Sequence, residues 1–169
     1  MVENTRARVG SMVREATGEQ VGREFYAAYL YLSMSGYFDA ANLPGFARWM
    51  RRQYEEETQH ALKLFDSLLD RGDHVQLAPI DPPPSSFRSP LDAFEQALEH
   101  EKQVTAHIHE LYDLALQEKD YPSKVLLDWF VQEQVEEEKS ASEIVERLKM
   151  AGEDGAALLM LDKELGERQ

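Results

Sequence analysis

Acidic, amide and imidazole side chains interrupt four apolar stripes of this sequence, each near the middle of its stripe. Residues three or four apart share one face of a helix, so an apolar stripe with this spacing marks a buried face. The third stripe, for example, is predicted to contain Phe94, Leu98, Glu101, Thr105, Ile108 and Tyr112. The interrupting residues that could bind a metal ion are Glu24, Glu57, His60, Glu101, Gln134 and Glu137. If the four stripes meet in one core, these side chains converge at about the same level.

These converging side chains would form a buried polar layer whose negative charge needs a positive counter-charge. A lone buried carboxylate destabilises a fold by several kcal/mol, and no lysine or arginine occupies the stripes at this level. The four glutamates carry four negative charges, which two divalent cations would balance. Oxygen donors with one imidazole suit Fe(II), Mn(II) or Zn(II), and not soft-ligand ions such as Cu(I). The pattern therefore predicts a dinuclear metal site, with His60 and Gln134 as neutral ligands.

Each of these residues has an ordinary structural interpretation when it is taken alone. A bare Glu-x-x-His such as Glu57 and His60 is common on helices, and a single glutamate in a stripe usually lies at a boundary and reaches water. Tyr31 is most often an amphipathic core residue whose hydroxyl has found a partner. The metal interpretation depends on the coincidence of interruptions at one level of four segments.

A second set of acids lies beside the first. Glu56, Glu133 and Glu136 each directly precede one of the candidate ligands, which turns them by about 100° around the helix. Acidic runs such as 136–138 normally form a solvated face. The alternative is a third, weaker metal position beside the dinuclear pair, and the residues themselves leave both interpretations open.

Four long segments with helical periodicity carry the stripes, and clear breakers separate them. No alternating strand pattern stands out, so the expected fold class is all-α. Pro44 is a favourable first-turn proline, Gly72 suits a helix C-cap, and Ser89 is a candidate N-cap. We expect one domain over 1–169, with helices at about 6–38, 44–71, 90–119, 123–151 and, as a short fifth segment, 154–165.

The connections between the helices predict their topology. Only a few residues join the first helix to the second and the third to the fourth, which makes each pair antiparallel neighbours. The segment 72–90 is long and rich in proline. When extended it reaches about 55 Å, more than the length of about 40 Å that a long helix of the bundle requires. We therefore predict a four-helix bundle with one long crossover between the second and third helices.

Composition narrows the range of functions. The chain has 169 residues and a net charge of -14, so it lacks the basic surface that binding to nucleic acid or to an anionic membrane requires. It contains no cysteine, which excludes disulfides, thiolate ligands and iron–sulfur clusters. No apolar run reaches the length of a signal-peptide core or a transmembrane helix, so a cytoplasmic location is expected.

The sequence resembles the non-haem bacterial ferritins over nearly its whole length. Short motifs carry the resemblance in order along four predicted helices: 24–31 (EFYAAYLY), 56–60 (EETQH), 120–122 (DYP), 129–134 (WFVQEQ) and 136–139 (EEEK). The resemblance implies an iron-storage protein with ferroxidase activity. Such a protein oxidises Fe(II) with O₂ or H₂O₂ and stores the ferric product in a hollow homo-oligomeric shell of 24 subunits.

The resemblance also implies roles for individual residues. The ligands of the first ferroxidase iron correspond to Glu24, Glu57 and His60. The second iron would share Glu57 as a bridge and be completed by Glu101, Gln134 and Glu137. A third iron site corresponds to Glu56, Glu133, Glu136 and a shared Glu137. Tyr31 corresponds to the tyrosine beside the diiron centre, an electron donor or radical site. The fifth helix would line the four-fold axis of the shell; its alternative is docking on its own bundle.

Two departures from related families narrow the assignment. Bacterioferritins place a haem-ligating methionine directly after the bridging glutamate, where this chain has Thr58, and they end in a second Glu-x-x-His, which is absent here. Haem is therefore not expected. Animal ferritins place acids at the three-fold pore near the start of the fourth helix, where this chain has Lys124 and Leu127. Iron is therefore expected to enter by another pore or by a direct path through the shell.

Two other functions could use an acidic helical bundle. A diiron peroxidase or oxygenase would share the fold, but such enzymes usually repeat Glu-x-x-His on two helices, and the electron-transfer types add a cysteine-ligated iron domain. A non-catalytic helical interaction module would use its acids only for solubility. It predicts no stoichiometric metal binding, and it leaves the mid-stripe carboxylates unexplained.

Overall fold

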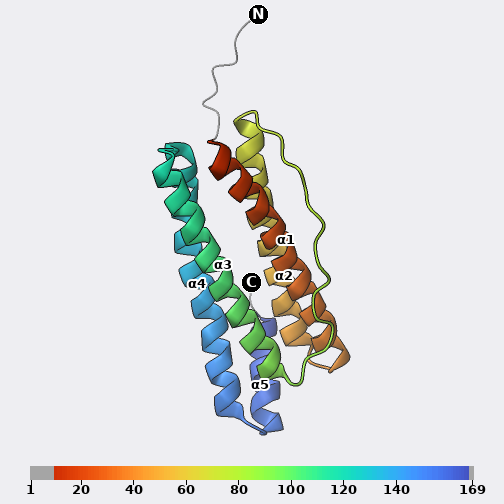
Figure 1. The fold of residues 1–169 in the computed structure, drawn as a ribbon. Helices are drawn as coiled ribbons and strands as arrows, with labels where there is room; N and C mark the ends of the chain where they lie inside the picture. Colours follow the sequence, from red (N-terminus) through yellow and green to blue (C-terminus); the bar gives the residue numbers. More distant parts are fainter. Residues whose placement is uncertain (1–9, 168–169) are drawn as a thin grey trace, which may run out of the picture.

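Five helices make up the described part of the chain, residues 10–167 of a computed structural model (Figure 1). Their bounds are Ser11–Ala40 for α1, Pro44–Asp70 for α2, Pro90–Gln117 for α3, Tyr121–Ala151 for α4 and Gly155–Gly166 for α5. The predicted start of the first helix at residue 6 lies outside the described residues. Within them there is no strand, which confirms the all-α class, and no helix is both long and apolar enough to cross a membrane.

Capping residues set the helix ends largely where the sequence predicts them. Pro44 occupies the first turn of α2, and Gly72 follows its end with a φ of 81°, a conformation that glycine adopts without strain. The Ser89 hydroxyl accepts the Asp92 N–H at 3.1 Å and begins α3. α4 begins at Tyr121, earlier than the predicted residue 123, because the Asp120 carboxylate accepts the Ser123 N–H at 3.3 Å.

The helices form two antiparallel hairpins, α1–α2 and α3–α4, joined by the long crossover (Figure 1). The crossover runs the length of the bundle on the outside of α1, so that α2 and α3 run parallel. It is attached along its path: the Ser33 hydroxyl donates to the Pro84 carbonyl, and the Phe87 ring packs edge-on against Tyr37 with centroids 5.3 Å apart. The predicted four-helix bundle with one crossover is confirmed.

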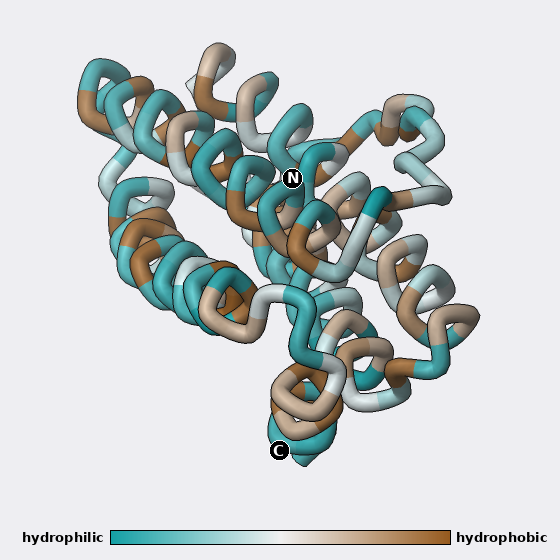
Figure 2. The backbone as a smooth tube through the Cα atoms, turned by 90° about the horizontal axis from the view of Figure 1, so that it is seen from below, coloured by the Kyte–Doolittle hydropathy of each residue, from teal (hydrophilic) through white to brown (hydrophobic). Residues whose placement is uncertain are grey.

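The apolar core is divided into two clusters by the polar layer. One cluster contains Phe38, Phe46 and Phe94, and the other contains Leu68 and Ile108. In the view from below, hydrophilic and hydrophobic residues alternate along the turns of the helices (Figure 2). The candidate metal ligands lie between the two clusters along every helix, so apolar side chains close the layer from both ends of the bundle.

On α3 the buried face differs in part from the predicted stripe. Glu101 and Ile108 are fully buried as expected. Three other predicted positions, Leu98, Thr105 and Tyr112, are only half-buried, and the residues that precede them lie in the core instead: Ala97, Val104 and Leu111. The rotation turns two hydroxyls toward α4. Thr105 donates to Glu138 Oε1 at 2.7 Å and Tyr112 donates to Asp128 Oδ1 at 2.8 Å.

The short α5 docks on the start of α2. The Asp162 carboxylate accepts the Phe46 N–H at 2.9 Å, and a Cβ at Gly45 would lie 1.6 Å from the Asp162 carbonyl oxygen, so only glycine permits this contact. Leu161 is buried by the docking, whereas Leu159 and Met160 are 60% and 74% exposed. Docking on its own bundle, one of the two alternatives for this helix, therefore occurs and still leaves an apolar face uncovered.

Candidate metal centre

The side chains that interrupt the four stripes meet in the middle of the bundle. Glu24 comes from α1, Glu57 and His60 from α2, Glu101 from α3, and Gln134 and Glu137 from α4. All six residues are buried, and none is more than 5% exposed. The convergence follows from the helix pairing, because hairpins of similar length bring the midpoints of their helices to one level.

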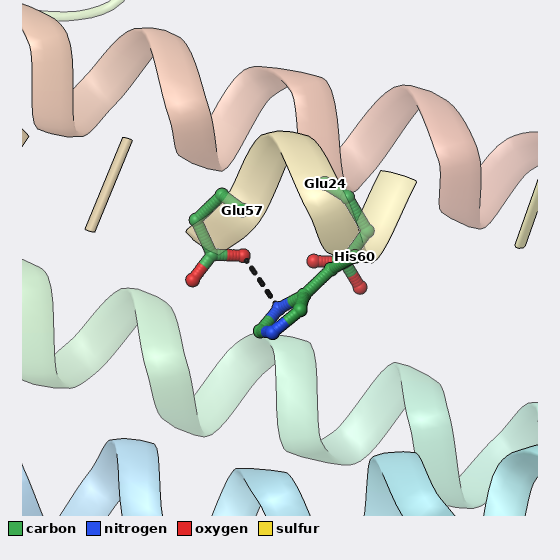
Figure 3. Close-up of side chains that lie close together, drawn as sticks. All are labelled: Glu24, Glu57 and His60. Carbon is green, nitrogen blue, oxygen red and sulfur yellow. Dashed lines mark hydrogen bonds and ion pairs between the residues drawn. The ribbon is translucent and has the colours of Figure 1, made fainter. Parts of the chain in front are cut away.

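Glu24, Glu57 and His60 form the first group with metal-binding geometry. Each offers one ligand atom, and these atoms all lie within 4.8 Å of one another. Glu57 and His60 project from the same face of α2, with Glu57 Oε2 3.3 Å from His60 Nδ1, and the Glu24 carboxylate lies next to them (Figure 3). The spacing of three residues on α2 produces this pairing.

Glu57, Glu101 and Glu137 form a second group under the same criterion, with ligand atoms within 4.8 Å of one another. Gln134 lies at its edge, where its amide nitrogen is 3.2 Å from Glu101 Oε2. Because Glu57 belongs to both groups, its two oxygens can serve neighbouring ions. The arrangement therefore suits two adjacent cations that share one carboxylate.

The donor set fits a pair of divalent ions. Glu24 Oε2 and Glu57 Oε1 are buried and have no hydrogen-bond partner. A buried polar atom left without a partner costs about 1–3 kcal/mol, and an ion bound between these two oxygens would remove that cost. Hard carboxylate oxygens with one imidazole match Fe(II), Mn(II) or Zn(II).

Burial and mutual repulsion keep protons on this layer in the metal-free protein. Desolvation raises the pKa of Glu101 to about 7. Desolvation, together with the charge of Glu101, raises the pKa of Glu137 to about 8. The pKa of Glu57 is also raised, by burial and then by the charges of Glu101 and Glu24. Divalent cations binding here would displace these protons.

Two buried glutamines hold the carboxylates in place, a role that the stripe pattern did not assign to them. Gln20 Nε2 donates to Glu24 Oε1 at 2.8 Å, and Gln53 Nε2 donates to Glu137 Oε2 at 2.8 Å. The first contact has a sequence signal, since the two residues are four apart on one helix. The second joins α2 to α4 and has no local signal.

Tyr31 lies in the core directly beside the second group. Its side chain is fully buried, and its hydroxyl donates to Glu101 Oε1 at 2.5 Å. Burial, followed by the charge of Glu101, raises its pKa well above the ordinary value, so the phenol stays protonated. Its ring packs edge-on against Trp49 with centroids 6.3 Å apart.

The flanking acids are only partly gathered. His60, Glu133 and Glu137 form a third group with ligand atoms within 4.8 Å of one another. Glu56 is half-buried and Glu136 is exposed, and in the described part of the chain neither joins a group of three metal-binding side chains. Of the acids predicted for a third site, the fold thus brings Glu133 to Glu137, and places the other two outside that group.

Comparison with known proteins finds relatives along almost the whole chain. A family model described as the ferritin-like domain matches residues 14–151. The bacterial non-heme ferritin of Bacteroides fragilis is 39% identical over 160 residues, covering 95% of this chain and 99% of the relative. That of Staphylococcus saprophyticus is 38% identical over 154 residues, covering 91% and 92%.

Solved structures of ferritins are similar to this chain in fold as well as in sequence. A crystal structure of an open-pore ferritin from the hyperthermophilic archaeon Archaeoglobus fulgidus superposes with a TM-score of 0.94. It shares 52% sequence identity over 95% of this chain and 99% of that one. The chain therefore belongs to the ferritin family.

Proposed function

We propose that this protein is an iron-storage ferritin with ferroxidase activity. Two Fe(II) ions bind as substrate, the first at Glu24, Glu57 and His60 and the second at Glu57, Glu101, Gln134 and Glu137. O₂ or H₂O₂ then oxidises them, and the ferric product is stored inside a shell of identical subunits. The observation that supports this proposal most directly is the pair of ligand groups that share Glu57 in the buried middle of a ferritin bundle.

The charge of the site differs in its balance with reduced and with oxidised iron. The four carboxylates neutralise two Fe(II) ions, but two Fe(III) ions carry six positive charges. The oxidised pair is therefore under-neutralised, and hydroxide or oxide from water completes the balance. The two apolar clusters restrict the access of bulk water, and the orphaned oxygens of Glu24 and Glu57 are available before any iron arrives. These features favour binding of the reduced ion and release of the oxidised one.

A third iron position and an electron donor belong to the same proposal. The group of Glu133 with Glu137 and His60 supports a position beside the pair, with Glu56 and Glu136 as additional ligands after side-chain movement. Two Fe(II) ions reduce O₂ only to H₂O₂, whereas a third iron and Tyr31 would supply the two further electrons that yield water. Tyr31→Phe should then raise the peroxide released per O₂ consumed, and an unchanged yield would exclude this role.

The assembled particle is proposed to contain 24 subunits and no haem. At the position that carries the haem ligand in bacterioferritins, the Thr58 hydroxyl donates to the Tyr54 carbonyl at 2.8 Å. Threonine has no thioether to bind the iron of a haem, and its hydroxyl is already engaged in this hydrogen bond. The exposed apolar face of α5 supports contact with further copies of the chain.

The decisive experiment combines oxidation and particle size. Fe(II) is added in air to the purified protein, the absorbance of the ferric product is followed, and the same sample is sized by light scattering. Glu24→Ala and His60→Ala should slow the rapid phase about 100-fold while the shell stays assembled. Glu55→Ala, which removes an exposed acid of α2, serves as the control. Parental rates in the two ligand variants would refute the diiron assignment, and a small particle that retained no iron would refute storage.

A further inference from the structure

A groove on the surface between α3 and α4 has Gln134, a proposed ligand of the second ion, in its lining. It has a volume of about 440 Å³, and its lining includes Thr105, His109, Gln134 and Glu138. Gln134 is only 2% exposed, so it forms the floor of the groove. Val131 and Val135 also line the groove, so both polar and apolar side chains of the two helices surround the approach to Gln134.

The Gln134 amide is held on its nitrogen side. Nε2 lies 3.2 Å from each of three oxygens, which are the Glu101 carbonyl, Glu101 Oε2 and Thr105 Oγ1. An amide NH₂ group has two protons to donate. When the Glu101 carboxylate turns to a metal ion, two acceptors remain for these protons, namely the Glu101 carbonyl and the Thr105 hydroxyl.

The proton of the Thr105 hydroxyl is committed elsewhere. It can be donated to Glu138 Oε1 at 2.7 Å or to the Glu101 carbonyl at 3.0 Å. A carbonyl and a carboxylate only accept, so whichever of them receives the proton, the hydroxyl meets Gln134 with a lone pair. Thr105 therefore accepts from the amide nitrogen and offers nothing to the amide oxygen.

We propose that Thr105 is a positioning residue for the second metal ion. Its hydroxyl, oriented by Glu138 on the facing helix, fixes the Gln134 amide with its nitrogen toward α3 and its oxygen available to the ion. β-branched threonine has few side-chain rotamers on a helix, and the bond to Glu138 selects the one that reaches α4. The inference rests on the proposed function, because Gln134 is a ligand only if the second ion binds where we place it.

The test uses Co(II) as a spectroscopic substitute for Fe(II) in the assembled protein. Titration followed by visible absorption should show two Co(II) ions per subunit in the parent chain. Thr105→Val keeps the shape but removes the hydroxyl, and it should weaken the second ion at least tenfold while the first ion binds as before. Thr105→Ser keeps the hydroxyl and should restore the second affinity. Glu138→Ala should give a smaller loss in the same direction, and provides a second route if Thr105→Val does not assemble.

The possible outcomes distinguish the proposed function from the positioning role of Thr105. A parent protein that fails to bind two Co(II) ions overturns the proposed function itself. A parent that binds two, with an unchanged second affinity in Thr105→Val, overturns the positioning role alone. Equal weakening of both ions would indicate general damage to the bundle and would also overturn it, as would a failure of Thr105→Ser to rescue.

Discussion

At the scale of single residues, neutral donors support the proposed ligand carboxylates. Gln20 donates to Glu24, Gln53 donates to Glu137, and Tyr31 donates to Glu101. A lysine or arginine in these places would hold the carboxylates equally well but would cancel the charge that attracts a cation. Amide and phenol donors fix the geometry and leave the negative charge for the metal.

Gln20→Leu should therefore weaken the first metal ion selectively. Arg23 Nη1 donates to Gln20 Oε1 at 3.4 Å, which leaves the amide nitrogen for Glu24. Loss of this outer support should reduce the affinity for the first ion about tenfold and leave the second unchanged, the reverse of the pattern expected for Thr105→Val. Calorimetric titration of the metal-free shell with Zn(II) measures both affinities. Equal effects on the two ions would contradict the assignment of Glu24 to the first.

The raised pKa values predict how stability depends on pH in the metal-free protein. Glu101 and Glu137 have pKa values of about 7 and about 8 in the folded state, against an ordinary value of 4.5. Between the ordinary pKa of 4.5 and the pKa values of the folded state, the folded protein keeps protons that the unfolded chain has released. The free energy of unfolding therefore falls as pH rises through this interval, and it levels off above pH values of about 8. We expect the thermal midpoint of chelator-treated protein to drop by about 5 °C from pH 6 to pH 8.

The control for this prediction is the double variant Glu101→Gln with Glu137→Gln, measured in parallel by scanning calorimetry. Its amides do not titrate, so the drop should be much smaller than in the parent. A parental midpoint that rises over the same interval, or an equal drop in the double variant, would show that other groups dominate.

At the scale of elements, periodicity and capping residues predict the helices well, and they fail where the choice depends on a neighbour. The stripe through Glu101 and Ile108 can continue on either of two adjacent positions, because 3.6 residues per turn fit both. The fold selects Val104 for the core and turns Thr105 toward Glu138. That selection depends on an acid on α4, which no local pattern on α3 contains.

The contacts of the candidate site also divide into those with a signal in the sequence and those without one. The level at which Glu24, Glu57 and Glu101 meet follows from helix pairing, so the convergence of these proposed ligands can be predicted from the sequence. The contact of Glu133 with His60 on α2 has no such signal, and neither has the exposure of Glu136. Such contacts depend on the angles at which helices cross.

Asp162→Ala should loosen the docking of α5 on α2. The substitution removes the acceptor for the Phe46 N–H at the first turn of α2, and loss of an N-terminal capping contact costs about 1 kcal/mol. Hydrogen exchange of the Phe46 amide and of α5 should accelerate severalfold. Asp162→Asn, which can still accept, should behave like the parent. If both variants exchanged at the parental rate, the contact would have no part in holding α5.

At the scale of the whole molecule, the uncovered face of α5 predicts how assembly can be broken. Met160→Glu places a charge on a side chain that is 74% exposed in the single chain and buried between copies in the proposed shell. Burial of an unpaired carboxylate should shift the particle from a full shell to small oligomers. Light scattering measures the change, with Lys163→Glu as the control at an exposed position of the same helix. A full shell in Met160→Glu would place α5 outside the contacts between copies.

The long crossover separates the chain into two hairpins that can form from contacts close in sequence, while their docking requires closure of a far longer loop. Glu24 and His60 lie on the first hairpin, and Glu101 and Glu137 lie on the second. Glu57, on the first hairpin, belongs to both ligand groups, and the second group also needs Glu101 and Glu137 of the second hairpin. In a chain still being synthesised, the proposed two-ion centre would therefore be incomplete until α4 has emerged and docked. Under the proposed function, capture of an iron pair would thereby be confined to subunits that have finished folding.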